Sequence, residues 1–178
     1  VLSVFRDRVY EIEEILKNGG EAEMKKILVS RCLYEADMAG YEGEGREMND
    51  PRFLKCKAEG RLMPICPEAF GGPEIIGVDA EIKDGRVMAD DGRDVTEAYT
   101  RGAQKAVRIA ERNDVLCAVL RETSPMCGSH SIFDGTFSKK LVPGSGVAAD
   151  ALKNSGIPVF SENEFDKIEA LIEADQMG

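Results

Sequence analysis

The chain has 178 residues, which suits one domain, or one domain with an appendage, and allows a hydrophobic core. Its formal net charge of −10 argues against a nucleic-acid polymer as the main partner, because binding to phosphates needs concentrated Lys and Arg. No apolar run reaches membrane-spanning length, and the first residues lack the apolar stretch of a signal peptide. We therefore expect a cytoplasmic protein without a membrane partner.

The first residues predict a helix. Apolar residues recur at helical spacing over 3–17, and Asn18, Gly19 and Gly20 form a stop signal. We expect residues 1–24 to be a helical extension and residues 25–178 to be an α/β domain. The extension is expected either to pack on the sheet or to mediate self-association into a homo-oligomer.

Strand and helix signals alternate through the rest of the chain. Short apolar runs predict strands at 27–31, 62–65, 115–120 and 157–160, the last at an edge because of Pro158. Helical patterns occupy 49–60, 94–112, 147–154 and the segment after 161. Asp84-Gly85 predicts a hairpin turn within 81–88, and 69–77 is expected to be a loop. This order predicts a Rossmann-like, three-layer α/β domain with a small, mostly parallel sheet of four to five strands.

Three cysteines stand where predicted strands stop. Cys32 follows the run 27–31, Cys66 follows 62–65, and Cys127 lies in the Ser-Pro turn after 115–120. Ligands of open α/β sheets bind outside the carboxyl ends of the strands. The pattern therefore predicts a site with three thiols at one edge of the sheet.

The five cysteines have no tight disulfide spacing, and in a cytosolic protein such thiols favour metal binding or catalysis over a disulfide framework. Three separated thiolates are able to hold three irons of a four-iron cluster, but three unconnected, partly buried cysteines are an equal alternative. A zinc ribbon is disfavoured without CxxC spacing. Cys117 is expected in the core, and Cys56 is expected to be structural or on the surface.

Polar residues flank the thiols. Glu68 is expected to be either a general acid/base or a carboxylate that stabilises a helix N-terminus. Glu122 is expected to line the same edge or to pair with Arg121 or Arg31. Ser124 and Ser129 are expected either to donate hydrogen bonds to a substrate or cluster sulfide or to close their own turns.

Eight short motifs occur in order over roughly residues 25–165, each of them weak alone. They are 27–30 before Cys32, Cys66-Pro67-Glu68 with Gly71-Gly72, 94–96, Gly102-Ala103, 124–129, 133–137, 144–147 and 156–160. Together they resemble the TudS/YbbK-like family, which is associated with thiouracil desulfidase. The chain departs from the family pattern after Cys32, at 40–43, at Met126 and at 73–76. One basic residue of the family pattern is missing at 40–43 and another at 73–76.

The resemblance implies a [4Fe-4S] cluster held by Cys32, Cys66 and Cys127. It also implies a non-redox, Lewis-acid hydrolysis that removes sulfur from a small thiolated compound such as a thiouracil-like nucleobase. Glu68 and Ser124 are then the expected catalytic residues, and Ser129 and Glu122 are expected to bind the substrate. Three alternatives remain: an iron–sulfur or sulfide-binding protein without desulfidase turnover, a thiol-redox protein, and a binding module with an inactive site.

Overall fold

A computed structural model describes residues 24–35 and 47–177. The expected helix at 3–17 and the glycine-rich stretch 40–45 lie outside these residues. Among the helices of the described part, none combines the length and apolarity needed to cross a membrane.

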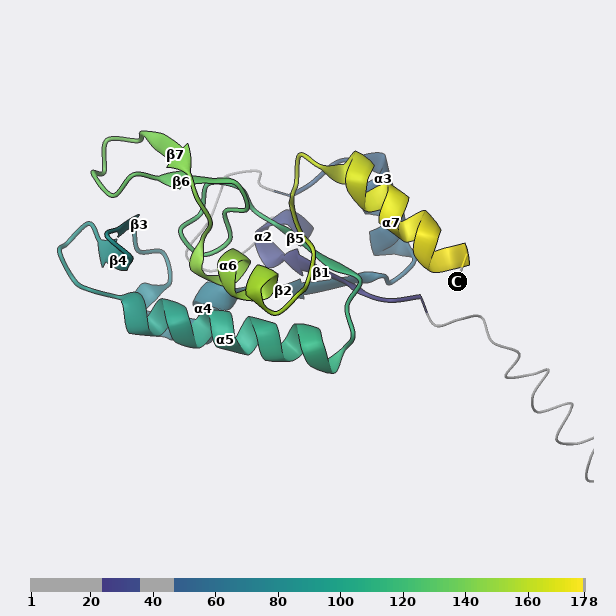
Figure 1. Ribbon diagram of the computed structural model, residues 1–178, viewed down its shortest axis with the longest axis horizontal. Coiled ribbons are helices and arrows are strands. Elements are labelled where there is room, and N and C mark those ends of the chain that lie inside the picture. Colours follow the sequence, from purple (N-terminus) through teal and green to yellow (C-terminus); the bar gives the residue numbers. More distant parts are fainter. Residues whose placement is uncertain (1–23, 36–46, 178) are drawn as a thin grey trace, which may run out of the picture.

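A four-stranded parallel sheet forms the centre of the fold, as the sequence predicted (Figure 1). Its strand order is β2-β1-β5-β8, with β1 Ile27–Ser30, β2 Leu62–Ile65, β5 Cys117–Leu120 and β8 Val159–Ser161. Every residue of β1 and β5 is buried, because both faces of these central strands are covered. The strand β8, which Pro158 directly precedes, lies at an edge, as expected.

Helices cover both faces of the sheet and give the three predicted layers (Figure 1). Alternate strand residues face opposite layers: Leu28 and Leu120 pack in one core, and Val29 and Val119 in the other. The first core includes α4 Pro67–Gly71, α5 Thr96–Arg112 and α6 Val147–Asn154. The second core includes α3 Pro51–Ala58 and α7 Phe165–Met177. Cys56 and Cys117 are both buried in this second core, so Cys56 is structural and not on the surface.

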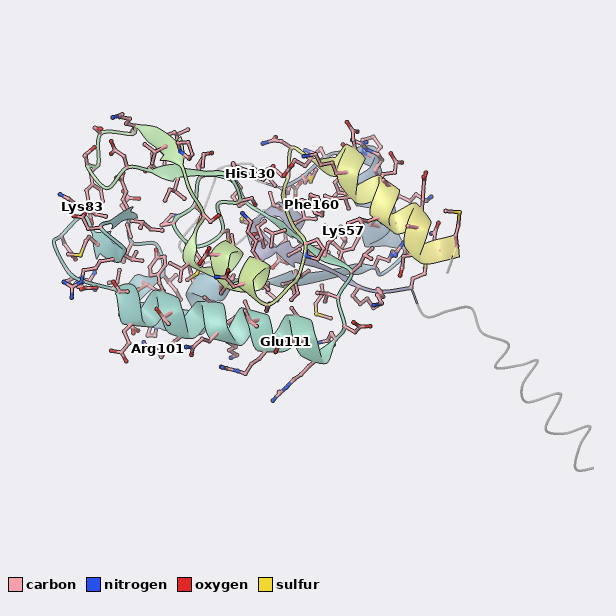
Figure 2. The ribbon with its side chains drawn as sticks, in the orientation of Figure 1. Lys57, Lys83, Arg101, Glu111, His130 and Phe160 are labelled. Carbon is pink, nitrogen blue, oxygen red and sulfur yellow. The ribbon has the colours of Figure 1, made fainter. Side chains whose placement is uncertain are left out.

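The long helix α5 is strongly amphipathic. Asp94 Oδ1 accepts a hydrogen bond of 3.0 Å from the backbone N–H of Thr96 at its start. Small residues and Tyr99 form its buried face, whereas Arg101 and Glu111 lie on its exposed face (Figure 2). The buried face lets α4 and α6 pack closely against it.

Two antiparallel hairpins accompany the sheet. The first joins β3 Ala80–Lys83 to β4 Arg86–Ala89, with Asp84 and Gly85 at positive φ in the turn, as predicted. The second joins β6 Ser131–Phe133 to β7 Leu141–Pro143. By itself, the sequence of 132–137 predicts an extended segment with a turn, and three-residue strands give too little periodicity to predict the hairpin. The strands β3 and β6 contact each other, so the hairpins form one unit.

Two segments are helical where the sequence did not predict a helix. The chain turns into α2 Arg31–Tyr34 directly after β1, which places Cys32 in a helical turn. The expectation of a loop over 69–77 was wrong, because α4 extends to Gly71 and a 3₁₀ turn follows at Pro73–Ile75. Pro67 and Pro73 explain the difference, since proline at the first position of a helix has its φ already fixed.

Candidate metal centre

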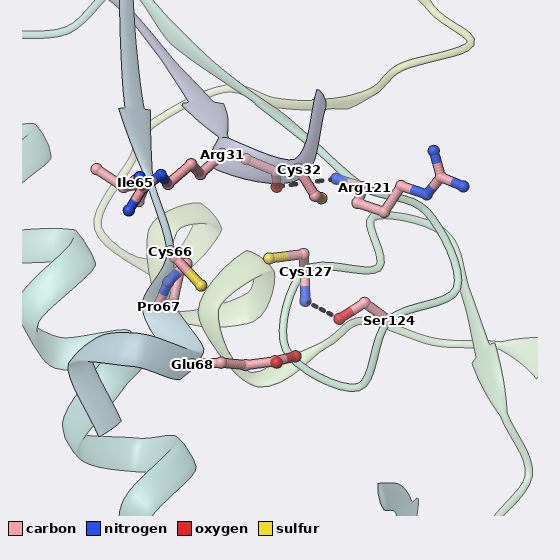
Figure 3. A pocket seen from close by; sticks show the side chains of 10 residues that line it. Arg31, Cys32, Ile65, Cys66, Pro67, Glu68, Arg121, Ser124 and Cys127 are labelled. Carbon is pink, nitrogen blue, oxygen red and sulfur yellow. Dashed lines mark hydrogen bonds between the residues drawn. The ribbon is translucent and has the colours of Figure 1, made fainter. Parts of the chain in front are cut away.

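Cys32, Cys66 and Cys127 lie around one small cavity of about 60 Å³. Figure 3 shows the sulfur atoms of Cys66 and Cys127 pointing toward one another, with the Glu68 side chain along one side. The residues that line the cavity are Ser30, Arg31, Cys32, Ile65, Cys66, Pro67, Glu68, Arg121, Ser124 and Cys127. The sequence-based expectation that three strand ends bring these thiols to one edge of the sheet agrees with this arrangement.

The strand register explains why the thiols meet. Ser30 of β1 is the register partner of Ile65 of β2, so the next residues of both strands, which include Cys66, emerge at the same edge. Cys66 then precedes Pro67, the first residue of α4. Gly102 of α5 lets α4 approach closely, because a Cβ there would lie 2.1 Å from the carbonyl oxygen of Pro67. The position of Cys66 therefore depends on a small residue in a distant helix.

The loop of Cys127 is closed by Ser124. Ser124 Oγ accepts hydrogen bonds of 3.1 Å from the backbone N–H groups of Met126 and of Cys127. The Ser124 carbonyl accepts a third, of 2.8 Å, from Gly128. Gly146 allows the start of α6 to touch this loop, because a Cβ there would lie 2.7 Å from the Cys127 nitrogen. Ser124 closes its own turn and also lines the cavity.

Glu122 organises the segment that follows Cys127. Its Oε1 accepts hydrogen bonds from the backbone N–H groups of Ser129, His130 and Ser131, at 3.2, 3.0 and 2.8 Å. Burial would raise the pKa of Glu122, but the N–H groups of His130, Ser131 and Thr123 outweigh it and lower the pKa. Glu122 is therefore a carboxylate that holds the loop together.

The cavity disfavours a bare thiolate at Cys127. Burial raises the pKa of the Cys127 thiol well above its ordinary value, a hydrogen bond with Ser30 opposes this, and the charges of Glu68, Cys32 and Cys66 raise it further. A bound metal removes this penalty, because its positive charge stabilises the thiolate. Ser30 was not predicted as part of the site. The only signal was its place as a polar residue at the end of a fully buried strand.

Glu68 occupies the boundary between the thiol cavity and a second, larger one. Burial raises the pKa of its carboxyl to about 7. The larger cavity measures about 590 Å³ and shares Glu68, Arg121 and Ser124 with the thiol cavity. The other residues that line it are Val78, Asp79, Ala80, Glu81, Tyr99, Glu122, Thr123, Pro125, Phe133, Phe137 and Lys139. The two hairpins therefore supply much of a chamber beside the thiols.

Two of the polar residues near the thiols lie apart from both cavities. Ser129 lines neither, and its enclosed Oγ has no hydrogen-bond partner among the residues that the structure describes. His130 is exposed and pairs with Glu164. Tyr99, which the sequence did not single out as a site residue, lines the larger cavity together with Glu68 and residues of the hairpins. Burial raises the pKa of its hydroxyl, and the charges of Glu68, Cys127 and Asp79 raise it further.

Comparison with known proteins accounts for this arrangement. Residues 27–164 match the family described as 2-thiouracil desulfurase. The chain belongs to this family. Membership makes it an enzyme of the desulfidase type, as the ordered motifs predicted.

Two relatives of this desulfurase-family chain support the assignment. The uncharacterized protein YbbK of Bacillus subtilis (strain 168) is 38% identical over 154 residues, which cover 80% of this chain and 99% of YbbK. A solved structure described as the [4Fe-4S]-dependent thiouracil desulfidase TudS superposes with a TM-score of 0.77 at 30% identity. That match covers 84% of this chain and 99% of TudS, and it confirms the predicted fold class.

Proposed function

We propose that this protein is an iron–sulfur-cluster-dependent desulfidase that acts on a small thiolated compound of the thiouracil type. The observation that carries the proposal is a cavity bordered by three thiols that adjoins a larger chamber through Glu68 and Ser124. The similarity to a protein described as a [4Fe-4S]-dependent thiouracil desulfidase supports it. The reaction is a hydrolysis in which a C=S group and water become a C=O group and hydrogen sulfide, with no net redox change.

The donor set fits a cluster. In the described part of the chain, no three His, Cys, Asp or Glu side chains converge closely enough to hold a single metal ion. Cys32, Cys66 and Cys127 border a space instead, and a four-iron cluster takes its thiolates at separate irons. Cys32, Cys66 and Cys127 would hold such a cluster, which would supply a Lewis acid for the soft sulfur of a thione.

The residues of the chain supply the remaining chemistry. We assign Glu68 as the acid/base group, because its side chain lies beside the thiols and also reaches the larger chamber. It takes a proton from the water that adds to the thione carbon and returns a proton to the departing sulfur. Ser124 Oγ accepts two backbone hydrogen bonds, so its own O–H is left to donate to the substrate or to a cluster sulfide.

Substrate contacts by Glu122 and Ser129 stay predictions. Glu122 lines the larger chamber, so part of this residue is within reach of a bound substrate. Ser129 has an enclosed hydroxyl, and contact with a substrate requires a movement of its loop.

Iron and acid-labile sulfide, measured on anaerobically prepared protein, test the cofactor. We expect about four of each per chain in the parent and in Cys56→Ala, whose thiol lies in the second core. Cys127→Ala should lose both. Little iron in the parent after anaerobic reconstitution would overturn the proposal and favour a thiol-redox or binding function.

Release of sulfide from thiolated heterocycles tests the turnover. We expect the parent with its cluster to convert 2-thiouracil or a related thione to the oxo compound, with one sulfide per product. A full cluster without sulfide release from a panel of thiones would replace the proposal by a protein that binds iron–sulfur or sulfide without turnover.

A further inference from the structure

Tyr99 projects from the buried face of α5 into the wall of the larger chamber. Its side chain is only 1% exposed and packs in the same core as Ile75 and Val95. A ring held in this way has lost its rotational freedom before any ligand arrives. A polar group on such a ring binds at a lower entropic cost than one on a mobile side chain.

The hydroxyl of Tyr99 has no hydrogen-bond partner in the part of the chain that the structure describes. A buried tyrosine hydroxyl usually finds one. The fully enclosed side-chain atoms without a partner in the described residues are Arg61 Nη1 and Ser129 Oγ. Since Tyr99 Oη is not among them, it keeps access to the chamber that the residue lines.

The chemistry of the surrounding wall indicates what this hydroxyl meets. Four acidic side chains line the same chamber, from Glu68, Asp79, Glu81 and Glu122. Its two cationic residues are Arg121, which pairs with Glu162, and Lys139, which is exposed to solvent. A carbonyl oxygen of a ligand is repelled by the acidic groups and needs a donor. Tyr99 carries a neutral O–H donor among them.

We propose that Tyr99 Oη donates a hydrogen bond to a carbonyl oxygen of the bound substrate and thereby selects thiones that carry a second, oxygen-bearing carbon. This inference rests on the proposed desulfidase function and adds a specificity-determining residue to it.

The test compares two ligands and two proteins. The ligands are 2-thiouracil, which has a C=O group in addition to its C=S group, and pyrimidine-2-thione, which has the C=S group alone. The proteins are the parent and Tyr99→Phe, both with their cluster, and the measurements are the Kd by titration calorimetry together with kcat and KM. We expect Tyr99→Phe to raise the Kd and KM for 2-thiouracil about three- to tenfold and to leave the values for pyrimidine-2-thione unchanged. The kcat should stay within about twofold, because the bond serves binding.

Tyr34→Phe is the matched control, because it removes the same atom from a tyrosine that lines neither cavity. It should change no value. Equal Kd values of the parent and Tyr99→Phe for 2-thiouracil would overturn the inference, as would equal effects on both ligands.

The same measurements separate this inference from the proposed function. An absence of sulfide release by the parent would overturn the function, while a ligand-selective change in Kd would still support the role of Tyr99. If Tyr99→Phe fails to fold, the inference is still tested by the affinities of the parent protein for the two ligands. Its Kd should be at least threefold lower for 2-thiouracil than for pyrimidine-2-thione, and equal values would contradict the inference.

Discussion

Glu122 Oε1 accepts a hydrogen bond of 2.8 Å from the backbone N–H of Ser131, which begins the strand after the Cys127 loop. The same oxygen accepts hydrogen bonds from Ser129 and His130. One carboxylate therefore ties the residue before the Cys127 turn to the residues after it. The loop that presents the third thiol is closed from both sides, by Ser124 within the turn and by Glu122 at its base.

Removal of this carboxylate should loosen the loop. We expect Glu122→Ala to lower the free energy of unfolding by about 2 kcal/mol, because four backbone N–H groups lose their acceptor. Glu122→Gln keeps one oxygen acceptor and should cost less than half of this value. Urea denaturation monitored by circular dichroism measures both, and equal costs for the two variants would show that the hydrogen bonds contribute nothing specific.

The contact between α4 and α5 leaves no space for a methyl group at Gly102. Gly102→Ala places a Cβ against the Pro67 carbonyl and should cost about 1–3 kcal/mol of stability, because α4 must move. The shift also moves Cys66, so the iron content per chain should fall. Gln104→Ala on the exposed face of the same helix is the control and should change neither value. Full iron content in folded Gly102→Ala would show that the placement of α4 does not limit cluster binding.

Substitution of Glu68 should lower the catalytic rate without changing the amount of bound cluster. Glu68→Gln keeps the size of the side chain but cannot exchange a proton, so we expect kcat to fall about 100-fold or more. The iron and sulfide content should equal that of the parent, because the three thiols are untouched. A kcat within threefold of the parent value would assign the proton transfers to another group, such as a water molecule in the larger chamber.

Glu164 should contribute to stability at neutral pH and lose that contribution in acid. Burial would raise its pKa, but Lys167, the Ser161 N–H and His130 outweigh it and lower the pKa to about 2. Because the pKa of Glu164 is lower in the folded protein, its ionised carboxylate stabilises the fold at pH values above about 4.5, which is the pKa in the unfolded chain. This contribution disappears as the pH falls from 4.5 to 2. With allowance for solvent screening, we expect a loss of about 2 kcal/mol.

The comparison with Glu164→Gln isolates this contribution. The variant should be less stable than the parent at pH 7 and nearly as stable at pH 2.5, in denaturant titrations at both values. A constant difference between the two proteins across this range would mean that Glu164 does not titrate as described.

Local patterns were sufficient for much of the fold. The apolar runs that became β1, β2 and β5 have a length and composition that favour buried parallel strands, and the face of α5 repeats at helical spacing. The thiols could be placed together because parallel strands that follow helices must end at the same edge of the sheet. The ordered motifs also pointed to the family, since they preserve the residues that follow these strand ends.

Other features depend on contacts between residues that are distant in the chain, and no local pattern contains them. Glu122 could have faced the substrate or paired with Arg121, and only the return of the chain through Ser131 made it an acceptor for backbone N–H groups. The chamber exists because the hairpin of β3 packs against that of β6, which brings Tyr99 and Phe137 to one space. Strand and helix propensities act over a few residues, whereas a cavity is the space that packing between whole elements leaves open.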